Sequence, residues 1–182
     1  MNILQAIDDA AVFRPLLRDP ETWAAWRAFL AALFALPMDD DQLATYQSCT
    51  GRIEPPTSPA TEAWLVIGRR GGKSFVLALI AVYLACFRDW RASLAPGERA
   101  TVMVIAADRR QARTIMRYVK GILGAVPMLS ATVEAERQEA VDLNNRVTIE
   151  VHTASFRTVR GYTIVAALLD ELAFWIIDED SS

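Results

Sequence analysis

Runs of apolar residues alternate with helical patterns along most of the chain. Short, continuous apolar runs are typical of strands buried on both faces, and they cover residues 63–68, 100–107 and 163–171. Two longer segments predict helices: residues 72–88 are apolar on nearly all sides, and residues 108–123 carry apolar positions at helical spacing. This alternation predicts an α/β fold with a mostly parallel sheet and helices on both of its faces.

The segment before the last apolar run has a different pattern. Apolar and polar residues alternate over residues 147–152, directly after the pair Asn144-Asn145. A period of two is typical of a strand with one solvated face, and two asparagines suit a tight turn, so we expect a β-hairpin here. His152 falls on the polar face of that strand, where we expect it to be solvated.

The N-terminal part of the chain predicts helices. Residues 1–36 lack glycine and are rich in apolar residues, and Asp19-Pro20-Glu21 is a helix-start signal. A turn and a short helix are expected to follow, and then a loop rich in Pro, Thr and Ser. We therefore divide the chain into a helical segment, residues 1–45, which packs on the core, and an α/β domain, residues 46–182.

Composition narrows the function classes. The 182 residues are 53% hydrophobic with a net charge of −3, which indicates a globular chain with a sizeable core and no overall polycationic character. Two cysteines and a single histidine make a zinc site or a Cys–His nucleophile improbable, so we interpret the cysteines as reduced thiols. The N-terminus lacks a basic signal-peptide region, and the apolar run 75–87 is too short to span a bilayer.

The stretch "WLVIGRRGGKS", residues 64–74, has the features of a phosphate-binding loop between a strand and a helix. Such loops direct backbone N–H groups and a helix N-terminus at phosphates, and glycines permit the close approach. Lys73 is expected on the terminal phosphates and Ser74 on Mg²⁺, in a site for ATP. The residues expected to bind the nucleotide here are Gly68, Arg69, Arg70, Gly71, Gly72, Lys73 and Ser74. The first glycine comes one position later than in the usual spacing, so a glycine turn that happens to precede Lys-Ser is the alternative.

An acidic pair, Asp170-Glu171, ends the apolar run "IVAALLDE". In phosphate-loop enzymes a carboxylate at the end of a neighbouring strand holds Mg²⁺, and a second one polarises the attacking water. We therefore predict Asp170 as a metal ligand and Glu171 as the general base. The alternative is a strand that simply reaches solvent at this point. Loop and acidic pair together predict a nucleotide hydrolase, and they require Lys73 to lie within a few ångströms of the two carboxylates.

The two motifs together resemble those of the large terminase subunit of tailed bacteriophages, whose ATPase domain drives viral DNA into procapsids. The similarity extends from "PETWAAWRAFLAALFALP" through "EAWLVIGRRGGKS" to "FRTVRGYTIVAALLDELAFW", and terminases carry a shortened loop of the kind found at residues 68–74. The resemblance implies that Arg69 reaches the γ-phosphate and that Arg160 acts across a subunit boundary. It also implies that Gln47 reads adenine, with Tyr46 stacking on the base. Arg160 as a surface arginine and Gln47 as a solvent-facing helix residue remain alternatives.

The resemblance also implies partners and surroundings. It suggests double-stranded DNA, a portal protein, a small terminase subunit, a homo-oligomeric ring and the host cytoplasm, without a membrane. Because the family pattern continues past the acidic pair, we expect an incomplete sheet and no nuclease domain in these residues. The arginines of residues 109–120 either bind DNA phosphates or are simply solvated. A helicase-like translocase and an inactive prophage remnant are the alternative functions; "DELA" in place of a DExH/D sequence favours the terminase.

Overall fold

The computed structural model describes residues 1–17, 19–154 and 161–175. The chain forms two compact units, Met1–Arg69 and Arg70–Ser182, and each is described here by itself. This boundary lies between Arg69 and Arg70, inside the glycine- and arginine-rich loop, whereas the division made from sequence placed it after residue 45.

The first unit is helical, in short pieces. It contains α1 (Ile3–Asp8), α2 (Ala24–Leu33) and α3 (Asp40–Thr50), with single turns of 3₁₀ helix between α1 and α2 at Arg14–Leu16 and Pro20–Trp23. Capping boxes begin α1 and α3, where the side chains of Asn2 and Asp39 accept a hydrogen bond from the third helical residue. The helical prediction for residues 1–36 is confirmed, although the structure divides this segment into several short helices.

The predicted strand at residues 63–68 is wrong. These residues pair with no strand among the described residues, and Trp64 and Val66 are 75% and 105% exposed. A strand exists only where a neighbouring strand completes its hydrogen bonds, and that partner is a property of the whole fold. The apolar sequence is therefore right for a buried strand, but the described residues supply no strand that pairs with it.

The second unit contains a five-stranded sheet in the order β2-β3-β4-β1-β5. Its strands are β1 (Ala100–Ala106), β2 (Val133–Glu136), β3 (Ala140–Leu143), β4 (Val147–Thr153) and β5 (Thr163–Leu169). The central strand β1 is parallel to both β4 and β5, whereas β3 is antiparallel to both of its neighbours, β2 and β4. The predicted α/β class is confirmed, with a mixed sheet that stays open at β5, which pairs only with β1 among the described strands.

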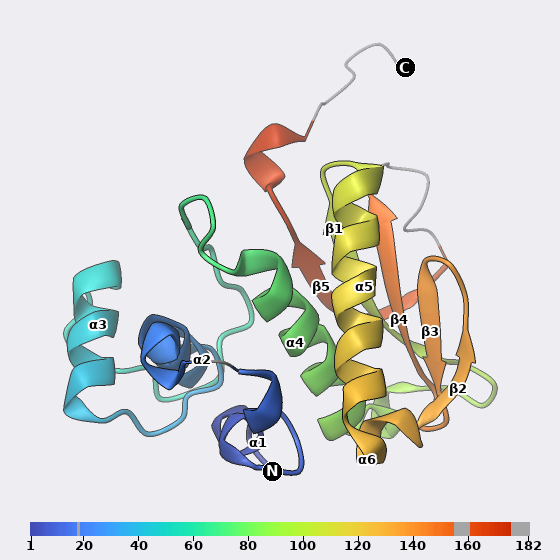
Figure 1. The fold of residues 1–182 in the computed structure, drawn as a ribbon, viewed down its shortest axis with the longest axis horizontal. Helices are drawn as coiled ribbons and strands as arrows, with labels where there is room; N and C mark the ends of the chain where they lie inside the picture. Colours follow the sequence, from blue (N-terminus) through green and yellow to red (C-terminus); the bar gives the residue numbers. More distant parts are fainter. Residues whose placement is uncertain (18, 155–160, 176–182) are drawn as a thin grey trace. The chain divides into compact units, whose positions relative to one another are not determined.

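Two long helices pack on this sheet, and Figure 1 shows α4 and α5 side by side. The first, α4 (Lys73–Phe87), is apolar all round and buried over most of its length, as its sequence predicted. The second, α5 (Arg109–Ala125), buries one apolar stripe and exposes its arginines. Short helices at Arg91–Ser93, Pro127–Ser130 (α6) and Leu172–Phe174 complete the unit.

The pairing of β1 with β5 determines where the polar residues gather. The two strands run parallel, with Ile105 opposite Leu169, so their carboxyl ends lie at the same edge of the sheet. Asp108, which caps α5, follows β1, and Asp170 follows β5 directly. Ligand sites in open α/β sheets form at this edge, so the parallel pairing brings the candidate residues together.

The predicted hairpin is confirmed as β3 and β4, joined at Asn144-Asn145. The expectation for His152 is wrong, because its side chain is only 13% exposed and its Nε2 lies 2.8 Å from Oε2 of Glu150. The alternation along the strand predicted correctly which face His152 lies on. It did not predict that neighbouring side chains bury this face. Within the described residues, no helix is both long enough and apolar enough to cross a membrane.

Candidate functional site

The site begins where the loop turns into α4. Gly72 caps the helix with φ of +78°, and its carbonyl accepts hydrogen bonds from the N–H groups of Phe75 and Val76, both at 3.1 Å. Glycine adopts this left-handed conformation without the strain that a Cβ atom causes. Arg70 adopts a left-handed φ of +63° without that advantage. The turn places Lys73 and Ser74 at a helix N-terminus, where backbone N–H groups favour an anion.

Lys73 and Glu171 form an ion pair. Nζ of Lys73 donates to Oε1 of Glu171 at 3.0 Å, across 98 positions of sequence, and the two side chains are 29% and 28% exposed. The hydrogen bond from Lys73 is the main reason that the pKa of Glu171 lies below its ordinary value, and Gln111 contributes in the same direction. The close approach of Lys73 to the acidic pair, which the motifs required, is therefore present.

Asp170 is the buried member of the acidic pair, only 3% exposed. Its Oδ2 accepts a hydrogen bond from Nε2 of Gln111 at 2.9 Å and a long one from Oγ of Ser74 at 3.5 Å. Its backbone N–H donates to the carbonyl of Ile105 at 2.8 Å, which ties the end of β5 to β1. Asp170 and Ser74, the two predicted metal ligands, thus lie side by side.

Glu171 has an unusual backbone conformation. Its φ of +54° and ψ of +40° are left-handed, which a residue with a Cβ adopts at a cost of about 1–3 kcal/mol. The strained turn separates two adjacent carboxylates, so that Asp170 faces Ser74 while Glu171 faces Lys73. Strain of this kind gathers at functional sites and agrees with a role for this residue pair.

Two cavities lined by described residues of the second unit bear on the location of the site. One of about 200 Å³ is lined by Ser74, Asp108, Arg110, Gln111 and Thr114, and so borders the candidate site. The other, of about 450 Å³, lies at the far end of α4, between residues 86–91 and 144–147, and contains none of the predicted site residues.

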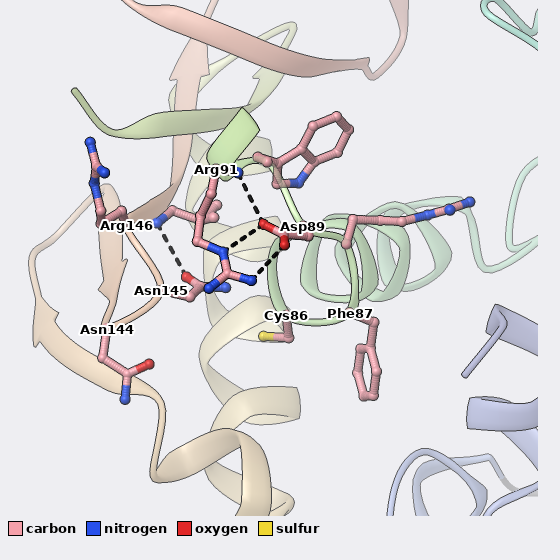
Figure 2. Close-up of a pocket in the computed structure, with 10 residues that line it drawn as sticks. Cys86, Phe87, Asp89, Arg91, Asn144, Asn145 and Arg146 are labelled. Atoms are coloured by element: carbon pink, nitrogen blue, oxygen red, sulfur yellow. Dashed lines mark hydrogen bonds and ion pairs between the residues drawn. The ribbon is translucent and has the colours of Figure 1, made fainter. Parts of the chain in front are cut away.

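Several polar groups of the larger cavity are hydrogen-bonded within the protein, and Figure 2 shows the bonds of Asp89, Arg91 and Asn145. Asp89 binds the guanidinium of Arg91, and Asn145 accepts a bond from the N–H of Val147. Arg146 donates to the carbonyls of Ala95 and Glu98. The smaller cavity next to Ser74 therefore suits the chemistry better than the larger one.

Five of the predicted residues are not described together with this site. Tyr46, Gln47, Gly68 and Arg69 belong to the first unit, where Tyr46 is buried and the amide of Gln47 donates to the carbonyl of Ile53 at 2.8 Å. Arg160 lies outside the described residues. The roles proposed for these five residues, in base recognition, phosphate contact and action between subunits, stay predictions.

Gln111 is a member of the site that the sequence analysis did not select. It stands in the first turn of α5, immediately after β1, and it reaches across to the carboxylate that follows β5. A usable signal was available: a polar residue just past the carboxyl end of a strand is close to whatever follows the neighbouring parallel strand.

Comparison with known proteins adds two findings. A family model described as "Terminase large subunit, T4likevirus-type, N-terminal" matches residues 64–181. Among solved structures, the crystal structure of the HK97 bacteriophage large terminase is similar, with a TM-score of 0.61 and 16% sequence identity over 92% of this chain and 30% of that one. At this identity the likeness shows the fold alone, and this chain spans about 30% of the HK97 protein. A comparison with curated protein sequences found no match.

Proposed function

The chain belongs to the T4-like-virus type of terminase large subunits, in their N-terminal region, and we propose that it is the ATPase part of a DNA-packaging motor. One observation carries the proposal: Lys73 lies 3.0 Å from Glu171, and Ser74 lies 3.5 Å from Asp170. A lysine and a hydroxyl at a helix N-terminus, facing two carboxylates at a strand end, are the parts that phosphoryl transfer to water requires.

The residues fit Mg²⁺ bound together with a nucleotide. A hydroxyl and a carboxylate are hard oxygen donors, which Mg²⁺ prefers, and it is usually held by one or two such groups plus substrate phosphates. The described residues contain no cluster of three or more His, Cys, Asp or Glu that would make a metal site from protein alone. Ser74 and Asp170 would hold the ion, which, when bound, neutralises charge on the transferring phosphoryl group.

The ion pair suggests how the protein's own residues act. Lys73 neutralises Glu171 without nucleotide, and phosphates offer the lysine a more highly charged partner. As Lys73 turns to the phosphates, Glu171 is released to accept a proton from water. Arg69 would draw charge off the γ-phosphate, and the backbone N–H groups of Gly71 and Gly72 would bind the phosphates. Gln47 would select adenine, with Tyr46 beside the base.

The partners follow from family membership and are part of the proposal. We include double-stranded DNA, a portal protein, a small terminase subunit and a ring of identical subunits in the host cytoplasm. One feature supports the binding of DNA. Four arginines of α5 are exposed, and none of them forms an ion pair with a described residue: Arg109, Arg110, Arg113 and Arg117. Such a row of cations suits backbone phosphates.

The test is hydrolysis of labelled ATP in a single turnover, with the protein in excess over nucleotide so that slow conversion is detected. The wild-type chain should form ADP when Mg²⁺ is present, and the Glu171→Gln variant should form it about 10²- to 10⁴-fold more slowly. A second arm of the experiment adds duplex DNA, to examine whether DNA changes the rate of ATP hydrolysis. Equal rates for both proteins would show that Glu171 is not the base, and absence of ATP binding would remove the proposal altogether.

A further inference from the structure

Asp170 is a buried carboxylate whose described hydrogen-bond donors are neutral. At 3% exposure it receives one short bond, from Nε2 of Gln111 at 2.9 Å, and one long bond, from Oγ of Ser74 at 3.5 Å. No described lysine or arginine forms an ion pair with it. A buried carboxylate without donors is costly, so Gln111 provides most of the hydrogen bonding that keeps this group in place.

The backbone of Gln111 is itself fixed. Its N–H donates to the capping side chain of Asp108 at 2.9 Å, which anchors the first turn of α5. That turn follows β1 directly, and β1 is the neighbour of β5, at whose end Asp170 stands. Gln111 therefore reaches Asp170 from a rigid element, which is what a side chain needs to hold another one precisely.

The surroundings of Gln111 indicate a functional position. Its half-buried side chain lines the cavity of about 200 Å³ that also contains Ser74 and Arg110. Glutamine offers a carbonyl oxygen besides the N–H group used on Asp170, so the amide can also accept a hydrogen bond from a water in that cavity. A residue with only a packing role would present an apolar group here and leave Asp170 unsatisfied.

We propose that Gln111 is a positioning residue, which holds Asp170 in one orientation so that its carboxylate is ready for Mg²⁺ before the nucleotide arrives. The inference rests on the proposed function, since it concerns the same site. Partners of metal-binding carboxylates orient them, and their removal lowers metal affinity by about 10- to 100-fold. Gln111 acts through the carboxylate of Asp170, to which its Nε2 donates at 2.9 Å.

The test compares the Mg²⁺ dependence of ATP binding in the wild-type chain and in Gln111→Met, which keeps the side-chain length but lacks the N–H donor. We expect the Mg²⁺ concentration at half-maximal enhancement of ATP binding to rise about 10- to 100-fold, while ATP binding in EDTA stays unchanged. The matched control is Gln138→Met, at an exposed position before β3, which should leave both quantities as in the wild type.

A double-mutant cycle separates positioning from packing. In an Asp170→Asn background, Gln111→Met should add less than about twofold to the change in Mg²⁺ dependence, because residues that act through one another are not additive. If Gln111→Met fails to fold, Gln111→Asn replaces it, since the shorter amide cannot span the 2.9 Å bond. Wild-type Mg²⁺ dependence in the Gln111 variant, or full additivity in the cycle, would overturn the inference. Absence of ATP binding by the wild-type chain would instead overturn the proposed function.

Discussion

The ion pair between Lys73 and Glu171 makes a specific prediction for the variant Glu171→Gln. Glutamine keeps the length of glutamate but lacks its charge, so the variant removes the charge attraction to Lys73 at 3.0 Å together with the carboxylate proposed as the base. More than a quarter of each side chain is exposed, at 29% and 28%, so solvent screens the pair. Its contribution is then about 0.2–1 kcal/mol, as for other accessible pairs.

Nucleotide binding opposes this pair, because the proposed mechanism moves Lys73 from the carboxylate to the phosphates. Removing a competing interaction of about 0.2–1 kcal/mol strengthens ATP binding about 1.4- to 5-fold. Loss of the negative charge next to the phosphates acts in the same direction. Glu171→Gln should therefore bind ATP more tightly than the wild type, and at the same time hydrolyse it far more slowly.

Calorimetric titration with ATP and Mg²⁺ measures the affinity. The matched control is Glu136→Gln, because Glu136 pairs with Lys120 at 3.2 Å on the protein surface, away from the loop. That variant should bind ATP as the wild type does. Weaker binding by Glu171→Gln would refute the exchange of partners by Lys73, since it would mean that Glu171 contributes attraction to the nucleotide complex.

Two further predictions concern the fold. Desolvation raises the pKa of the half-buried Cys86 thiol to about 12, so exposed Cys49 should react with a thiol reagent at pH 8 much faster than Cys86. Because the unfolded thiol ionises nearer 9, stability should also fall as pH rises from about 9 towards 12. Equal labelling rates of the two cysteines in the folded chain would show that the structure does not protect the Cys86 thiol. Ile149→Ala in β4, where the side chain is fully buried, should lower the free energy of unfolding by about 2–5 kcal/mol in urea titrations, whereas Ile53→Ala, 77% exposed, should change it by less than about 0.5 kcal/mol.

Local sequence was sufficient for much of the fold. The helices α4 and α5 and the strands β1, β4 and β5 follow from apolar periodicity, which depends only on nearby residues. The meeting of Lys73 with Glu171 was also predicted, from the phosphate-loop motif and the acidic pair, although the residues before Lys73 form no described strand.

The other features of the fold and the site depend on contacts between residues far apart in the sequence, and local patterns did not predict them. Residues 63–68 have the composition of a buried strand but lack a described partner. The strand β2, Val133–Glu136, does alternate apolar and acidic residues, but four residues are too few for this pattern to predict a strand. The bond of Gln111 to Asp170 joins residues that follow two different strands, and spacing along the chain does not specify such a contact. His152 and Glu150 share one face of β4, so their closeness follows from their spacing, but the burial of this face does not. The sequence predicted that Lys73 contacts a phosphate, and it did not predict the direct ion pair that Lys73 forms with Glu171.

The most direct test of the central claim, a phosphate-binding loop at residues 68–74, uses the two lysines of the chain. Both form ion pairs with a glutamate, Lys73 at 3.0 Å and Lys120 at 3.2 Å, and their side chains are 29% and 30% exposed. Affinity for ATP with Mg²⁺ should fall more than about 100-fold in Lys73→Ala, through loss of a charged contact to phosphate. It should stay within about twofold of the wild type in Lys120→Ala. Equal affinities of the two variants for ATP would contradict the account.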